Sequence, residues 1–85
     1  MDRIFIDVRE KFEYKRGHVQ GALNLPPAKL LKGAYELEEI PYDTELVVYC
    51  RTGHRSNMAI SILSRLGYKN LVNGINKEQV EARYF

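Results

Sequence analysis

Short apolar runs alternate along the chain with stretches in which apolar residues recur at helical spacing. Such runs, when bounded by turn residues, predict buried strands. The clearest is 45–49, in which Leu46 to Tyr49 is continuously apolar, as expected for a parallel strand covered on both faces. Further strands are predicted at 4–8, 21–25 and 71–72.

The segments between these runs carry helical patterns. The best is 56–66, where apolar residues recur at spacings of one, three and four and Gly67 follows as a C-terminal cap. Further helices are predicted at 10–16, 28–35 and 76–83. Gly74 is predicted to lie in a turn. Strands that alternate with helices over short connections predict a small α/β domain with a mainly parallel sheet of about four strands.

Length and composition fit one small domain over residues 1–85, with a core that needs no covalent staple. The single cysteine excludes an internal disulfide and indicates a reducing compartment. The charged N-terminus does not resemble a secretory signal, and no apolar run approaches the roughly 20 residues that span a bilayer. We therefore expect a soluble, cytoplasmic protein, unless a precursor segment has been removed.

Charge is nearly balanced over the whole chain but not locally. Thirteen basic and 11 acidic residues give a net charge of +2, with no basic stripe, so we expect no nucleic-acid partner. Between Leu46 and Leu66 there is no carboxylate, whereas Arg51, Arg55 and Arg65 all lie there. An anionic ligand is therefore expected to bind in this segment.

The only thiol, Cys50, ends the best predicted strand, where ligands bind in open α/β sheets. The loop Arg51-Thr52-Gly53-His54-Arg55 is short enough to curl back over the sulfur, and Gly53 permits the positive φ that lets amides converge on an anion. Ser56 is expected to cap the next helix. A cysteine that ends an apolar strand is often only part of the core. The basic loop behind Cys50 favours a reactive thiol instead.

A reactive thiol needs a lowered pKa. Lowering the pKa of Cys50 from about 8.5 to about 6.5 requires roughly 2.7 kcal/mol. A helix dipole supplies part of this free energy, and two nearby guanidinium groups are expected to supply the remainder.

The segment Cys50 to Ser56, CRTGHRS, resembles the active-site loop of the rhodanese family of sulfurtransferases. The segments 6–10, IDVRE, and 17–26, GHVQGALNLP, are similar to two upstream signatures of that family. The three motifs occur in the family's order and cover most of residues 4–74. The resemblance implies a rhodanese-like three-layer domain in which helices flank the parallel sheet.

The resemblance also implies a two-step sulfur transfer. The Cys50 thiolate would attack the outer sulfur of thiosulfate or a similar donor and become a persulfide. Cyanide, a thiol or a sulfur-accepting protein would then take the sulfur. The amides of residues 51–55 would hold the persulfide, and Arg51 and Arg55 would attract the anionic donor. No metal or organic cofactor is implied.

Two other functions remain open. Cysteine phosphatases, and arsenate reductases by the same loop logic, place an arginine six positions after the cysteine. Here that position is Ser56, and Arg55 comes one position too early. The tighter loop suits one sulfur atom better than a tetrahedral phosphate. A sulfur carrier or binding module without thiosulfate turnover is compatible with all the residues named.

Four polar residues near these motifs are assigned mainly non-catalytic roles. Asp7 and Arg9 follow the first predicted strand and are expected to pair within the fold. His18 is expected to hydrogen-bond to backbone, and His54 to act mainly through its charge at low pH.

The chain departs from the rhodanese pattern at both ends of the resemblance. Family members usually have an extra strand and helix before the first signature, and that strand would pair with the one at 71–72. We therefore expect an uncovered sheet edge that a second copy of the chain can cover. The family's pair of glycines followed by tryptophan reads Asn73-Gly74-Ile75, and the chain has no tryptophan.

Overall fold

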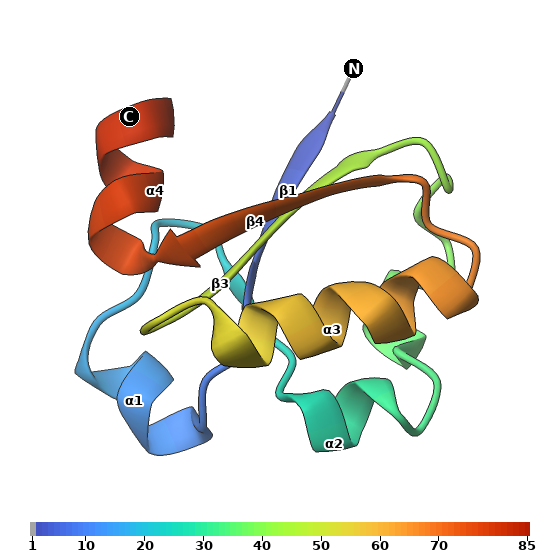
Figure 1. The fold of residues 1–85 in the computed structure, drawn as a ribbon, viewed down its shortest axis with the longest axis horizontal. Coiled ribbons are helices and arrows are strands. Elements are labelled where there is room, and N and C mark those ends of the chain that lie inside the picture. Colours follow the sequence, from blue (N-terminus) through green and yellow to red (C-terminus); the bar gives the residue numbers. More distant parts are fainter. Residues whose placement is uncertain (1) are drawn as a thin grey trace.

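The computed structural model describes residues 2–85 and contains one parallel four-stranded sheet. Its strands, in the spatial order β2-β1-β3-β4, are Arg3–Asp7 (β1), Leu23–Asn24 (β2), Glu45–Cys50 (β3) and Asn70–Asn76 (β4). The helices are Lys11–Arg16 (α1), Pro27–Leu30 (α2), His54–Arg65 (α3) and Lys77–Tyr84 (α4), with a 3₁₀ turn at Tyr35–Leu37. The predicted α/β class and the four parallel strands are confirmed (Figure 1).

Helices cover both faces of the sheet. On one face Leu46 and Val48 of β3 pack against a cluster that includes Leu63 of α3, and α2 lies alongside α3 (Figure 1). On the other face Val47 and Tyr49 of β3 join a cluster with Val80 of α4. Because successive strand residues point to opposite faces, covering both faces requires the continuous apolar run seen in the sequence.

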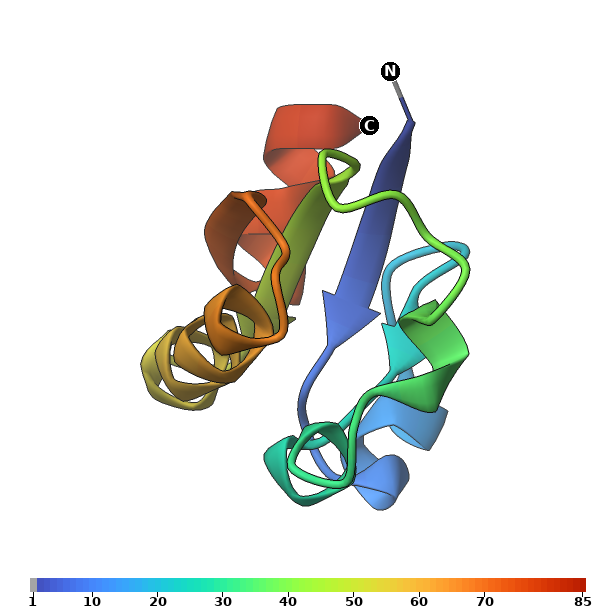
Figure 2. The same cartoon turned by 90° about the vertical axis from the view of Figure 1, so that its right-hand side faces the viewer.

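The start of β1 and the end of α4 lie together at the amino end of the sheet, as both ribbon views show (Figure 2). The rings of Phe5 and Tyr84 make an edge contact with centroids 5.5 Å apart. The carboxyl ends of the strands, including Cys50, are therefore at the opposite end. Within residues 2–85, none of the helices combines the length and apolarity that crossing a bilayer requires.

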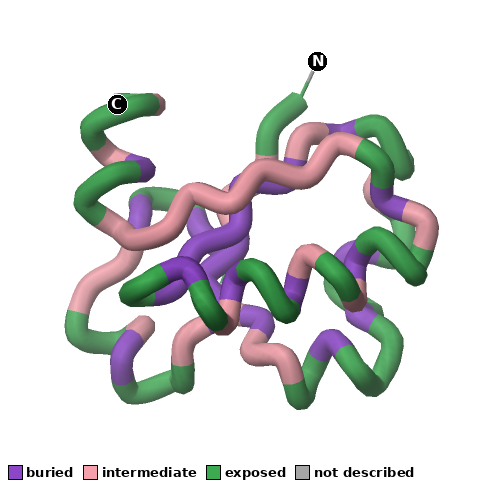
Figure 3. Tube along the Cα trace, in the orientation of Figure 1, coloured by how far each residue is buried: buried purple, intermediate pink, exposed green. Residues whose placement is uncertain are grey.

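Burial separates the central strand from the outer strand. β3 is buried at every position after Glu45, whereas β4 is half-buried along its whole length (Figure 3). β4 pairs with β3 on one side and, among the described residues, with no strand on the other. The expected free edge is therefore present, and its cover by a second copy remains a prediction.

Two helix boundaries differ from the prediction by two residues or more. α3 begins at His54 instead of Ser56, because Gly53, with φ of +93°, occupies the N-cap position. The helix expected over 28–35 ends at Leu30, because the chain turns through Gly33 and a left-handed Ala34 before the 3₁₀ turn. Apolar spacing does not report such local breaks.

The prediction that Gly74 lies in a turn is wrong. Gly74 lies inside β4, beside a register shift opposite Val48 and Tyr49 of β3. A Cβ atom at this position would lie 2.5 Å from Cγ2 of Val80 and 3.1 Å from Cγ1 of Val47. The glycine therefore allows α4 to pack closely against the sheet, and β4 is longer than the predicted strand at 71–72.

Candidate active site

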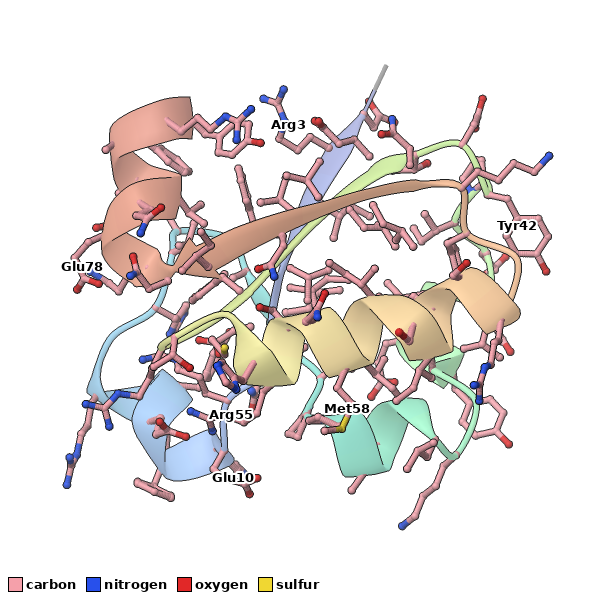
Figure 4. The ribbon with its side chains drawn as sticks, in the orientation of Figure 1. Arg3, Glu10, Tyr42, Arg55, Met58 and Glu78 are labelled. Carbon is pink, nitrogen blue, oxygen red and sulfur yellow. The ribbon has the colours of Figure 1, made fainter. Side chains whose placement is uncertain are left out.

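Cys50 is the last residue of β3, at the carboxyl end of the central part of the sheet. It is a free thiol, 2% exposed, and it lines a cavity of about 520 Å³. The remaining walls come from the loop after β1, from α1 and from the β4–α4 junction. In Figure 4, Arg55 lies between α1 and α3, and Glu78 marks the α4 side of this region.

The loop after Cys50 turns an amide group onto the sulfur. The N–H of Gly53 donates to Sγ of Cys50 at 3.1 Å. Gly53 has a φ of +93°, which a side chain would disfavour, and it directly precedes the first residue of α3. The amides of Thr52 and Ser56 also interact favourably with the ionised sulfur. We call the amides of Thr52, Gly53 and Ser56 the amide ring.

The amide ring favours the thiolate. Burial raises the pKa of the Cys50 thiol, but the amides of Ser56, Gly53 and Thr52, together with the Ser56 hydroxyl when its one proton turns from Asn73 to the ionised sulfur, outweigh burial and lower the pKa to about 7. A much larger share of the sulfur is then ionised at neutral pH than in an ordinary cysteine. The shift comes mainly from hydrogen-bond donors, whereas guanidinium charge was expected to supply much of it.

Ser56 does not cap α3, contrary to the prediction, because the helix begins two residues earlier. Its hydroxyl oxygen lies 3.6 Å from Sγ of Cys50 and donates to Oδ1 of Asn73 at 2.7 Å. The side-chain amide of Asn73 donates to the Gly53 carbonyl at 3.2 Å. Asn73 of β4 therefore holds both the loop and the first turn of α3. Sequence reasoning assigned it no role at the thiol, because an asparagine in a strand carries no local signal of such contacts.

Arg55 already has a buried counter-ion. Its two terminal nitrogens donate to Oε1 and Oε2 of Glu13 at 2.6 and 3.1 Å. Glu13 is 9% exposed, and its Oε1 also accepts the Glu10 N–H at 2.9 Å as part of a capping box on α1. The Arg55 hydrogen bonds lower the pKa of Glu13 to about 2. The expected role of Arg55 in attracting an anionic donor stays a prediction; its guanidinium is bound by Glu13 in this structure.

The other polar residues of the loop are more open. The side chain of Arg51 is 71% exposed, and its Nη1 lies 3.9 Å from Oε2 of Glu13, at the limit of an ion pair. Arg51 lines the cavity beside the sulfur. The side chains of Thr52 and His54 are exposed. Arg51 is therefore the loop guanidinium that is free to meet an incoming anion.

Asp7 and Arg9 pair within the fold, as expected. Nη2 of Arg9 lies 2.6 Å from Oδ2 of Asp7, and the Tyr49 hydroxyl donates to the same oxygen at 2.9 Å. The Tyr49 oxygen also accepts the Val19 N–H at 3.0 Å, and Arg9 donates to the Gly17 carbonyl at 2.8 Å. These contacts fix the loop after β1 next to the cavity.

His18 makes the backbone contact that the sequence predicted. Its Nδ1 lies 2.9 Å from the Tyr14 carbonyl oxygen. Its ring stacks on the Tyr14 ring, with the two centroids 3.7 Å apart. These contacts fit the structural role expected for His18.

Three curated relatives share most of this chain. It is 38% identical over 80 residues to "Putative thiosulfate sulfurtransferase, mitochondrial" of Schizosaccharomyces pombe, covering 82% of this chain and 56% of that protein. It is 38% identical over 69 residues to "Thiosulfate sulfurtransferase PspE" of Escherichia coli, covering 81% and 65%. It is 35% identical over 68 residues to "Putative sulfur carrier protein YrkF" of Bacillus subtilis, covering 80% and 35%. The chain thus spans about one third to two thirds of these relatives.

Solved structures and a family match agree with this likeness. A "rhodanese with anions from E. coli" has a TM-score of 0.79 at 32% identity, covering 91% of this chain and 89% of that one. The Rhodanese_3-like domain of Alr3790 from Anabaena shares the fold, with a TM-score of 0.78 at 21% identity, covering 95% and 92%. Residues 1–77 match the family described as "Rhodanese-like domain". The sequence resemblance is thereby confirmed, and the chain belongs to the rhodanese-like domain family.

Proposed function

We propose that the protein is a sulfurtransferase in which Cys50 carries the transferred sulfur as a persulfide. The observation that carries this proposal is the amide ring around the Cys50 sulfur, with the Gly53 N–H at 3.1 Å. Such a ring keeps the thiol ionised near neutral pH and suits a nucleophile. The names of the relatives, thiosulfate sulfurtransferase and sulfur carrier protein, support the same chemistry.

The first half-reaction transfers one sulfur atom from thiosulfate to the protein. The Cys50 thiolate attacks the outer sulfur, the S–S bond of thiosulfate breaks, and sulfite leaves with the bonding electron pair. Cys50 then carries a persulfide whose terminal sulfur is anionic. In the second half-reaction a thiolate or cyanide attacks this terminal sulfur, and the Cys50 thiolate leaves.

Arg51 is the residue that we assign to donor capture. Its side chain is 71% exposed at the cavity that contains Cys50, whereas Arg55 is held by Glu13. An exposed guanidinium beside a cavity attracts an anion by long-range electrostatics. The cavity of about 520 Å³ is larger than thiosulfate needs, which leaves space for a thiol acceptor or part of an acceptor protein.

A phosphatase or arsenate reductase fits the site less well. Arg55 comes one position early in the loop and is paired with Glu13. Phosphatases of this type also need an acid that protonates the leaving alkoxide. The pKa of Glu13 is about 2, so this carboxylate holds no proton near neutral pH.

The test is sulfur loading of the purified protein. Incubation with thiosulfate should add the mass of one sulfur atom, and Cys50→Ser should remove the gain, because Cys50 is the only thiol in the chain. Loss of the added mass on treatment with cyanide, with release of thiocyanate, would demonstrate turnover. Loading without turnover would indicate a sulfur carrier. A wild-type protein that gains no sulfur would exclude thiosulfate as the donor.

A further inference from the structure

One ion pair joins α1, which lines the cavity through Glu13, to α3, which begins three residues after Arg51. Glu13 comes from the middle of α1 and Arg55 from the first turn of α3, 42 positions later in the chain. Both carboxylate oxygens accept hydrogen bonds from Arg55. The side chain of Glu13 is 10% exposed and that of Arg55 is 33% exposed, so water screens this pair only in part. The contact is therefore stronger than a surface ion pair.

The position of Arg55 gives this pair a consequence for the sulfur. The pKa of Arg55 is raised first by its hydrogen bonds to Glu13 and also by the negative charge of Cys50. Arg55 stands between Gly53, whose N–H donates to Sγ of Cys50 at 3.1 Å, and Ser56, whose hydroxyl oxygen lies 3.6 Å from Sγ, so its guanidinium lies within electrostatic range of the thiolate. An unpaired guanidinium about 4–6 Å from an ionisable group typically favours the negative form by one to three pKa units.

The remaining charged groups around the cavity are either paired or open to water. Arg9, which follows β1, is bound by Asp7, and Lys77 of α4 pairs with Glu81 at 3.1 Å. The side chains of His54, Arg16 and Glu78 are exposed, as are Glu10, whose charge also acts on Arg55, and Arg51, whose Nη1 lies 3.9 Å from Oε2 of Glu13. Arg55 is the half-buried cation of this region that both interacts electrostatically with Cys50 and is bound by Glu13.

We propose that Glu13 is a positioning residue of the sulfur-transfer site, because it binds Arg55 and neutralises its charge. The Cys50 thiolate is then stabilised by the amide ring and the Ser56 hydroxyl and not by a full guanidinium charge. The inference rests on Cys50 being the reactive sulfur. It explains why a loop with two arginines derives its thiolate stabilisation mainly from hydrogen bonds.

This arrangement has a chemical advantage. The nucleophilicity of a thiolate falls as its pKa falls, and the best attacking thiol has a pKa near the ambient pH. A free Arg55 would produce more thiolate but a weaker nucleophile. By neutralising Arg55, Glu13 keeps the sulfur both substantially ionised and reactive near neutral pH.

The test measures the pH dependence of Cys50 alkylation by iodoacetamide, followed by mass. Glu13→Gln keeps the shape of the side chain and removes its charge. We expect the midpoint to move down by roughly half to one pH unit, so that alkylation at pH 6 is about two to four times faster than in the wild type. Glu78→Gln, which removes an exposed carboxylate of the same cavity, should leave the midpoint within about 0.2 units because water screens it.

Two more variants keep the test decisive. Arg55→Gln leaves the Glu13 carboxylate without its partner and should raise the midpoint. The double variant Glu13→Gln with Arg55→Gln should return it close to the wild-type value. A Glu13→Gln midpoint equal to that of the wild type, or raised together with a lower melting temperature, would overturn the proposal. Alkylation needs no sulfur donor, so this result is independent of whether thiosulfate loads Cys50.

Discussion

Two loops leave the same end of the sheet, one after β1 and one after β3, and a carboxylate–guanidinium pair lies beside each of them. At the end of β1, the buried Asp7 binds Arg9 of the following loop and the Tyr49 hydroxyl. Beside the loop after β3, Arg55 in the first turn of α3 pairs with Glu13, and the amide of Gly53 donates to the Cys50 sulfur. The contacts of the loop after β1 stabilise the fold, whereas the loop after β3 surrounds the sulfur of the candidate active site.

Charged side chains near the cavity stabilise the fold by pairing with each other, whereas neutral amide dipoles act on the Cys50 sulfur. The guanidinium groups of Arg9 and Arg55 are bound by carboxylates, and these pairs fix the positions of the loops. The amide ring directs neutral dipoles at a sulfur whose charge appears only on ionisation. Among residues 2–85, no buried side-chain nitrogen or oxygen lacks a hydrogen-bond partner. The groups near Cys50 that can bind an anion are therefore the backbone amides of its loop and the exposed guanidinium of Arg51.

Breaking the Asp7–Arg9 pair should have the largest effect, a loss of stability. Asp7→Ala leaves Arg9 and the Tyr49 hydroxyl without their buried acceptor. We expect the free energy of unfolding to fall by about 3–5 kcal/mol, measured by urea denaturation. Lys29→Ala, which breaks the exposed pair with Glu36, should cost less than about 0.5 kcal/mol. A loss below about 1 kcal/mol for Asp7→Ala would show that the loop after β1 does not depend on this pair.

A change of pH should affect sulfur loading of Cys50 more than it affects the Asp7–Arg9 pair. Because the pKa of Cys50 is about 7, sulfur loading should slow about tenfold for each pH unit below 7 and level off above about pH 8. The folded-state pKa lies below that of an unfolded cysteine, about 8.5, so this ionisation adds stability as pH rises above 7. The same contribution is lost as pH falls through 7. Initial loading rates between pH 5.5 and 9 would contradict this if they showed no break near 7.

Weakening the hydrogen bonds to the sulfur should have an intermediate effect. Ser56→Ala removes the hydroxyl that lies 3.6 Å from Sγ of Cys50 and donates to Asn73. We expect the pKa of Cys50 to rise by about one unit, measured by alkylation. Ser61→Ala changes an exposed serine further along α3 and should leave the pKa unaltered. An unchanged pKa in Ser56→Ala would assign the shift to the backbone amides alone.

Removing the exposed arginine should have the smallest effect. Arg51→Ala should raise the KM for thiosulfate by about three- to tenfold at low salt with little change in kcat, because a solvated guanidinium attracts the donor without binding the sulfur. The effect should shrink as salt is added. Arg65→Ala, at the exposed end of α3, is the matched control. A large fall in kcat with KM unchanged would place Arg51 in the reaction step instead.

Elements were predicted best where local pattern and burial coincide. β3 was predicted from its continuous apolar run, and the helix after Cys50 from its apolar spacing. The extents of α2 and β4 were missed, because a left-handed Ala34 and a close approach of Val80 to Gly74 depend on the surrounding structure. The position of Cys50 below a loop amide at the end of the sheet was predictable, since a strand end, a glycine and a helix start lie within a few consecutive residues.

The sequence by itself determined the strand–helix alternation and the loop whose amides reach Cys50, because both depend on neighbouring residues. Only the tertiary structure decided that Arg55 pairs with Glu13, 42 positions away, and that Ser56 pairs with Asn73, 17 positions away. The charges and hydroxyls of a loop can choose among many partners of suitable chemistry. Which partner each one meets is set by how the elements pack, and residue spacing along the chain carries no record of that choice.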